Sequence, residues 1–177
     1  AAEWADASGG GGAAGITLLS QDVITTAVAA VDITLPSGYT RFKLIGEDMD
    51  HSSTAAVRLR LSTDGGSTFL TGGFAFQLLR WYAPVGTSGI NSSSVNYIEI
   101  GSDLTSDGHF EADIISTANL FKLKSSAAWY AYAPAALVNN CSGMRSMSSV
   151  ANVLRIEGNS VNITAGTLSL YGYKESP

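Results

Sequence analysis

The fold is decided by one stretch of the chain, which reads Val57-Arg58-Leu59-Arg60-Leu61-Ser62-Thr63-Asp64-Gly65-Gly66-Ser67-Thr68-Phe69. Its first five residues alternate between apolar and basic side chains, which is the pattern of a strand with one buried and one solvated face. The Asp-Gly-Gly sequence that follows is typical of a tight turn, because glycine adopts a positive φ without steric cost. The stretch therefore predicts a β-strand that runs into a hairpin.

The same two-residue period recurs along the chain from Ile16 onward. Apolar and polar residues alternate in the segments 31–35, 41–44, 57–61, 74–78, 109–114, 121–124, 154–157 and 167–170. Turn-forming clusters separate the segments, at 36–38, 64–66, 87–89, 106–108 and 158–160. No segment carries the apolar stripe of an amphipathic helix. Eight or more short strands without helical connections predict an all-β fold, an antiparallel jelly-roll-like β-sandwich.

The first fifteen residues differ from the rest of the chain. A run of four glycines at 9–12 predicts a flexible N-terminal arm at 1–15, followed by a single sandwich domain at 16–177. Within the arm, Trp4 stands between Glu3 and Asp6 and has no local core to enter. Two interpretations remain open: a frayed terminus, or an anchor in which Trp4 fills a pocket of a partner protein.

The composition argues against several classes of function. The 10 basic and 15 acidic residues give a net charge of −5, so we expect no nucleic-acid partner and no membrane partner. The single cysteine, Cys141, rules out an intrachain disulfide and a cysteine-rich metal site. No stretch approaches the roughly 20 apolar residues of a membrane span. Because residues 1–14 lack a secretory signal and Ala1 suits a trimmed initiator Met, we expect the protein to be made inside a cell without export machinery.

Patterns for catalysis and metal binding are missing from the sequence. There is no Gly-x-Ser-x-Gly elbow, P-loop or dinucleotide fingerprint, so we predict no catalytic residue and no cofactor. Glu111 and Asp113 share one strand face and suit glycoside chemistry, but a solvent-facing pair is the expected role. The acidic cluster Glu47-Asp48-Met49-Asp50-His51 departs from the EF-hand pattern. We expect it to be a solvated loop between two strands, without a metal ion.

The turn after Leu61 resembles the Asp-box, whose pattern is Ser-x-Asp-x-Gly-x-Thr-Trp. The matching residues are Ser62, Asp64, Gly66, Thr68 and Phe69, with Phe69 in place of Trp. Sialidases carry this box as a structural corner repeated around a propeller. Here it occurs once, so we expect a structural hairpin in which Asp64 accepts hydrogen bonds from turn amides and Phe69 packs under the turn.

Two aromatic clusters are candidates for binding surfaces. Trp81 and Tyr82 follow an expected strand and form a possible ligand loop. Trp129, Tyr130 and Tyr132 alternate, which places Trp129 on one face of a strand and both tyrosines on the other. One face is expected to join the core. The other face is a subunit interface, a second core contact beneath a neighbouring loop, or a platform for sugar stacking.

Three stretches in order resemble a domain of virion proteins from tailed bacteriophages. They are Leu35-Pro36-Ser37-Gly38-Tyr39-Thr40-Arg41-Phe42-Lys43-Leu44, the stretch 58–69, and Ile163-Thr164-Ala165-Gly166-Thr167-Leu168-Ser169-Leu170-Tyr171-Gly172-Tyr173-Lys174. Their order and spacing are similar to those of phage tail-fibre, head-fibre and capsid-decoration proteins. The resemblance implies a jelly-roll sandwich, often a homotrimer, without enzymatic activity. Candidate interface residues are then Trp129, Tyr130, Tyr132, Tyr171 and Tyr173.

Among these proteins, a small capsid decoration or cement protein is the favoured interpretation, because the arm is too short for a fibre trunk. The expected partners are further copies of the chain and the major capsid protein or another virion protein, at the capsid surface. Folding without disulfides suits synthesis and assembly in the cytoplasm of the bacterial host. Trp4, Glu3 and Asp6 would form the anchor. The alternative is a tail-fibre or tip protein that recognises a host surface glycan. A free-standing carbohydrate-binding module or a hydrolase is a third interpretation.

Overall fold

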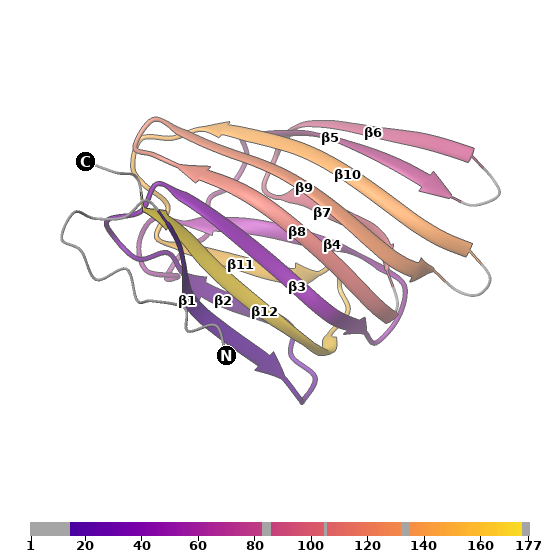
Figure 1. The fold of residues 1–177 in the computed structure, drawn as a ribbon. Coiled ribbons are helices and arrows are strands. Elements are labelled where there is room, and N and C mark those ends of the chain that lie inside the picture. Colours follow the sequence, from indigo (N-terminus) through magenta and orange to yellow (C-terminus); the bar gives the residue numbers. More distant parts are fainter. Residues whose placement is uncertain (1–14, 83–85, 105, 132–134, 175–177) are drawn as a thin grey trace, which may run out of the picture.

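A computed structural model of the protein describes residues 15–82, 86–104, 106–131 and 135–174; the side chains of 82, 102–104, 106, 129–131 and 135–137 lie outside the description. Two antiparallel sheets pack face to face (Figure 1). The larger sheet has the strand order β1 (Gly15–Ile24), β12 (Ile163–Lys174), β3 (Arg41–His51), β8 (Ser106–Ser116), β9 (Leu120–Ala131), β10 (Ala135–Ser146), β5 (Phe74–Tyr82) and β6 (Gly86–Val95). The smaller sheet has the order β2 (Ala30–Thr34), β11 (Val153–Gly158), β4 (Ala55–Ser62) and β7 (Ile98–Leu104).

The core lies between the two sheets, where the inward-facing residue of each apolar–polar pair is buried. The larger sheet contributes Phe42, Leu44, Phe110, Ile114, Phe121 and Leu78. The smaller sheet contributes Leu59, Leu61, Ile98, Ile100, Leu154 and Ile156. Each such side chain stabilises the fold by about 1.5–3 kcal/mol through removal of apolar surface from water. The predicted all-β sandwich is confirmed, whereas the finer jelly-roll topology is not confirmed by this strand order.

The acidic cluster at 47–51 is not the solvated loop that we expected. It forms the end of β3, which pairs with β12 at Glu47↔Thr167 and Asp50↔Ala165. Glu47 and Asp48 are both exposed, and the register against β8 shifts between Gly46 and Met49, as in a β-bulge. Because the extra residue restores the inward orientation, Met49 and His51 are buried. The apolar Met49 within the acidic run was the signal for this arrangement.

Two predicted turns are also wrong, because they lie within strands. Residues 87–89 belong to β6 and residues 106–108 to the start of β8. β6 is an edge strand that pairs with β5 alone among the described strands, so small polar side chains suit its exposed surface. In β8, Asp107 adopts a φ of 49° beside an irregular register, so turn chemistry occurs here within a strand. Asp107 donates its backbone N–H to Asp50 Oδ1 across 2.9 Å.

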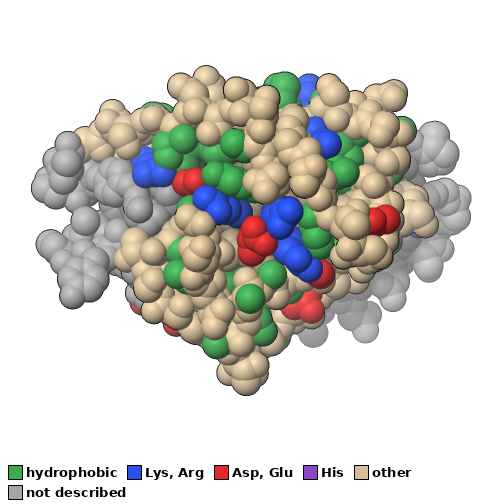
Figure 2. All heavy atoms as spheres, turned by 180° about the vertical axis from the view of Figure 1, so that it is seen from behind, with side chains coloured by type: hydrophobic (Ala, Val, Ile, Leu, Met, Phe, Trp, Pro, Cys, Tyr) green, Lys and Arg blue, Asp and Glu red, His purple; other side chains and the backbone are tan. Residues whose placement is uncertain are grey.

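The outward face of the smaller sheet carries basic and acidic side chains close together (Figure 2). Arg155 donates two hydrogen bonds of 2.7 Å to the carboxylate of Asp32 on the neighbouring strand. Arg60 lies 3.9 Å from Glu157. Arg58 on the same face donates a hydrogen bond of 2.6 Å to Asn159 Oδ1 and lies over the ring of Tyr97. Each of these three arginines is therefore held by a neighbouring group, two of them by carboxylates.

Inside the sandwich, Gly46 leaves room for the ring of its register partner Phe110. A Cβ at position 46 would overlap the Phe110 ring, which is fully buried. The aromatic ring therefore covers the glycine, an arrangement that also helps to set strand register. Gly89, on the exposed part of β6, is a natural comparison because a Cβ there would meet one backbone oxygen at 3.9 Å.

We predict that Gly46→Ala lowers the free energy of unfolding by about 1–3 kcal/mol, because the added methyl group overpacks the core against Phe110. Gly89→Ala should leave it within about 0.5 kcal/mol of the wild type, as surface substitutions do. Urea unfolding of the three proteins measures the difference. Equal stabilities of the two variants would contradict the packing described for Phe110.

Candidate functional site

The outward face of the larger sheet gathers side chains from strands that are far apart in sequence. Cross-strand partners in an antiparallel sheet point to the same side, so the register aligns them in rows. One row runs across seven strands through Ile16, Tyr173, Arg41, Ile115, Lys122, Met144 and Ala75. The next row contains Leu18, Tyr171, Lys43, Asp113, Lys124, Ser142 and Gln77.

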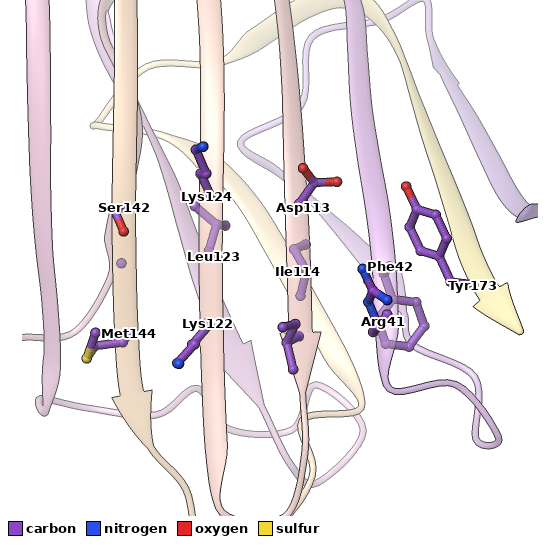
Figure 3. A pocket seen from close by; sticks show the side chains of 12 residues that line it. Arg41, Phe42, Asp113, Ile114, Lys122, Leu123, Lys124, Ser142, Met144 and Tyr173 are labelled. Atoms are coloured by element: carbon purple, nitrogen blue, oxygen red, sulfur yellow. The ribbon is translucent and has the colours of Figure 1, made fainter. Parts of the chain in front are cut away.

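A hollow of about 560 Å³ lies over these rows in the middle of the face. We call it the sheet-face hollow and define it by six of its lining residues: Tyr173, Arg41, Asp113, Lys122, Lys124 and Met144. Figure 3 shows these residues on five neighbouring strands, from β12 to β10. A second hollow of about 380 Å³ continues over β5 and β6 and shares Ser142 and Met144 with the first. Together they form a path across the strands.

At one side of the hollow, Lys43 and Glu111 form an ion pair, with 2.5 Å between Nζ and Oε2. The hydrogen bond between them raises the pKa of Lys43 and lowers the pKa of Glu111. The other carboxylate oxygen of Glu111 lies 3.7 Å from His109 Nε2. Glu111 is therefore held as a carboxylate by two neighbours and is poorly suited to act as a proton donor at neutral pH.

The basic side chains that line the hollow, unlike Lys43, have no carboxylate within ion-pair distance in the described part of the chain. Within the described part of the chain, Lys122 and Lys124 form no ion pair, and both are exposed. The guanidinium of Arg41 lies over the ring of Tyr173, 5.4 Å from its centroid. Asp113 is the carboxylate among the described lining residues. Three basic groups against one acidic group give the hollow a local charge of +2, in a chain with a net charge of −5.

Further along the same face lies a group of exposed apolar side chains, the apolar sheet patch, formed by Leu79, Trp81 and Val138. Their exposed fractions are 54%, 47% and 36%. Trp81 and Val138 are register partners, and Val138 also pairs with Ala128 of β9. Trp81 and Tyr82 therefore lie in β5 and not in the predicted loop, because β5 continues to pair with β10 and β6 up to Tyr82.

The predicted interface residues fall into two separate groups. Tyr171 and Tyr173 are half-buried in β12, whereas Trp129 and Tyr130 lie in β9, with β3 and β8 between the two strands. The side chains of Trp129 and Tyr130 lie outside the described residues, as does all of Tyr132. The predicted anchor residues Glu3, Trp4 and Asp6 also lie outside them.

The turn at Asp64 has the hydrogen bonds that its sequence predicts, but the predicted hairpin is wrong, because β4 lies in the smaller sheet and β5, the next strand, lies in the larger one. Asp64 accepts hydrogen bonds from the hydroxyl of Ser62 (2.6 Å), the hydroxyl of Thr68 (2.6 Å) and the backbone N–H of Thr68 (2.9 Å). Gly65 and Gly66 have φ values of 75° and 88°, which only glycine adopts at low cost. Phe69 is half-buried, and the guanidinium of Arg155 lies 3.9 Å from its ring centroid. Asp64 is thus committed to the turn.

Cys141 lies in the interior, on the opposite face of β10 from the hollow. It is 2% exposed, and burial and the nearby Glu99 raise the pKa of its thiol to about 12. The thiol is therefore protonated at neutral pH and poorly suited to nucleophilic attack. Arg80 and Glu99 form an ion pair of 3.0 Å between the sheets, and these inward groups do not reach the hollow.

No grouping of three or more histidine, cysteine or acidic side chains that could hold a metal ion occurs among the described residues. Within the same ranges there is no helix that could span a membrane. Comparison with known protein families gives no match, and no curated protein is similar to the chain in sequence.

The sequence signals for the hollow are the alternating pairs Arg41/Lys43 and Lys122/Lys124, which we interpreted as the solvated sides of two strands. That interpretation is correct for each strand taken alone. It could not reveal that β8 lies between β3 and β9, because strand order is not encoded in local periodicity. The convergence of these cations is therefore visible in the structure and hidden in the sequence.

We predict that Asp64 makes stability depend on acid pH. Its hydrogen bonds with Ser62 and Thr68 lower its pKa from 3.8 to about 2 in the folded protein. The carboxylate contributes stability above the unfolded pKa, and that contribution is lost as pH falls through the folded pKa. Between about pH 4.5 and about pH 2.5, urea unfolding should show a larger loss of the free energy of unfolding for the wild type than for Asp64→Asn. Parallel losses in the two proteins would contradict this role.

Proposed function

We propose that the protein is a non-enzymatic structural protein of a tailed-bacteriophage virion, of the capsid decoration type, which binds the head lattice and stabilises it. The three sequence stretches that resemble phage virion proteins support this class. The observation that carries an assembly role is the exposed apolar surface of β1, the strand at one edge of the larger sheet.

β1 is unusual for an edge strand. Ile16, Leu18 and Val23 are 53%, 50% and 63% exposed, and Asp22 is the only charged residue among its ten. Proteins commonly protect sheet edges with charges, because unpaired backbone groups and apolar side chains invite another chain to bind. A long, weakly charged edge therefore supports a protein whose edge is covered by a partner. β1 also directly follows the residues that contain Trp4, so edge and arm would bind the same partner.

The described residues also support a non-catalytic role. Glu111 and Asp64 are committed to ion pairs or turn hydrogen bonds, and the Cys141 thiol is buried and protonated. None of these groups lies next to an activated nucleophile in the described structure. The alternative, a tail-fibre or tip protein that recognises host glycan, is favoured by one observation, the sheet-face hollow.

The proposal includes a homotrimer. The apolar sheet patch lies beside the part of β9 that contains Trp129 and Tyr130, so it extends the candidate interface onto β5 and β10. Three exposed apolar side chains on adjacent strands form a contiguous surface of the kind that self-association buries.

We predict a trimeric mass by light scattering at micromolar concentration. Trp81→Ser combined with Val138→Ser should shift the mass toward the monomer, because the patch loses its apolar contacts. Val150→Ser, at an exposed apolar position outside the patch, should leave the trimer intact. A monomeric wild-type protein would contradict the trimer.

The decoration role is tested on phage heads that lack the protein. Leu18→Lys with Val23→Lys should weaken binding to such heads by at least about 100-fold, because two aliphatic contacts of about 1.5–3 kcal/mol each are lost and each 1.4 kcal/mol is a factor of ten. Val150→Lys introduces the same charge at an exposed position elsewhere and should bind normally. Heads without the protein should be more sensitive to heat. If particles without it fail to adsorb to their host yet survive heating as well as intact ones, the decoration role is wrong and the receptor-binding alternative holds.

A further inference from the structure

We propose that the sheet-face hollow is a binding site for an acidic saccharide, a ligand in which carboxylates are separated by neutral, hydroxyl-rich sugar units. This site is additional to the proposed attachment through β1 and does not depend on it. The carrying observation is that Arg41 of β3 and Lys122 and Lys124 of β9 converge on one hollow, whose one lining carboxylate, Asp113, is the register partner of Lys124 and neutralises these cations only in part.

The contrast between the two faces of the sandwich makes this charge informative. On the smaller sheet, Arg155 and Arg60 each have an acidic neighbour within 4 Å, and Arg58 is held by a hydrogen bond to Asn159 and by the ring of Tyr97. On the larger sheet, among the residues whose side chains are described, Lys122 and Lys124 have none. Single lysines scattered over a surface would not indicate a ligand site. Here two of them share one hollow with a guanidinium in a protein of net charge −5, so the hollow attracts anions that the whole protein repels.

The spacing of the cations favours a ligand with separated negative groups. Lys122 and Lys124 are two residues apart on β9, about 7 Å at the rise of a strand. Arg41 lies on β3, two strands from β9, which corresponds to about 10 Å. β8 runs between them and places Asp113 and Ile115 in the gap. A ligand that binds both sides must therefore have a neutral section over β8.

The groups in the gap suit hydroxyls better than phosphates. The Asp113 carboxylate accepts hydrogen bonds from sugar hydroxyls and repels a continuous phosphate backbone. Ser142 adds a hydroxyl at the β10 side of the hollow. Met144, which is 51% exposed, and the half-buried Tyr173 offer apolar surface to the C–H faces of sugar rings. Sites for single-stranded nucleic acids commonly offer several exposed aromatic rings for base stacking. Among the described lining residues that are exposed or half-buried, Tyr173 is the one aromatic side chain.

The path across the strands also suits an oligosaccharide. The second hollow continues from Met144 and Ser142 toward Gln77 and Asn91. Amide side chains both donate and accept hydrogen bonds, as neutral sugar units require. The acidic part of the ligand would lie over β3 to β9 and a neutral part over β5 and β6.

The test measures binding of a fluorescently labelled hyaluronan octasaccharide, which carries a carboxylate on alternate sugars, by anisotropy in low-salt buffer. A neutral chitin oligosaccharide and single-stranded oligothymidine serve as comparison ligands. We expect saturable binding of hyaluronan, weakened about tenfold by Lys124→Gln and by Lys122→Gln. Lys124→Arg retains the charge and should retain binding. Lys174 follows Tyr173 on β12 and so points to the other face of the sheet. Lys174→Gln removes the same charge away from the hollow and should bind hyaluronan like the wild type.

Three results would overturn the proposal. The first is no binding of hyaluronan by the wild-type protein. The second is equal weakening by Lys174→Gln, which would mean attraction by overall charge. The third is equal or tighter binding of oligothymidine, which would make the hollow a nucleic-acid site. A melting temperature equal to that of the wild type shows that each variant is folded, which is expected because both lysines are exposed. The head-binding defect of Leu18→Lys with Val23→Lys is measured separately, so either proposal can fail alone.

Discussion

The cross-strand register of the larger sheet is the constraint on which every surface feature depends. Side chains alternate between faces, so a slip of one residue in β9 would turn Lys122 and Lys124 inward and Leu123 outward. The buried side chains of Phe121 and Leu123 on β9 oppose that slip, because each would lose its place between the sheets. The packing of the core therefore determines which charges share the outward face.

Register shifts of the β-bulge kind restore the alternation of inward and outward side chains where the apolar–polar pattern of the sequence is interrupted. At Glu47 and Asp48 an extra residue lets two acidic side chains stay in solvent while Met49 returns to the core. A similar irregularity between Leu18 and Ser20 in β1 keeps Ile16, Leu18 and Val23 on positions paired with outward residues of β12. The two faces of the sandwich consequently differ in kind. On the smaller sheet Arg58, Arg60 and Arg155 each have a neighbouring hydrogen-bond or ion-pair partner, whereas the larger sheet presents an apolar edge, a cationic hollow and an apolar patch.

Much of this fold can be predicted from the sequence, because burial of one strand face leaves a two-residue period. The alternation at Leu59 and Leu61 and the turn at Asp64 are local signals, and both are confirmed. Turn-like residues mislead where a strand is at an edge or begins irregularly, as at 87–89 and 106–108. The hollow could not be predicted, since it depends on β8 lying between β3 and β9. Strand order is set by long-range packing and leaves no local pattern.

We propose that β1, at one edge of the larger sheet, attaches the protein to a phage head, while the sheet-face hollow remains available to a ligand. Cryo-electron microscopy of the purified virion tests this most directly, because it shows location and orientation together. If the proposal is correct, the sandwich lies on the capsid surface with the exposed apolar side chains of β1 against the lattice. The hollow around Lys122 and Lys124 then faces solvent. A sandwich at the tail tip, or one whose hollow is buried against the capsid, would contradict it.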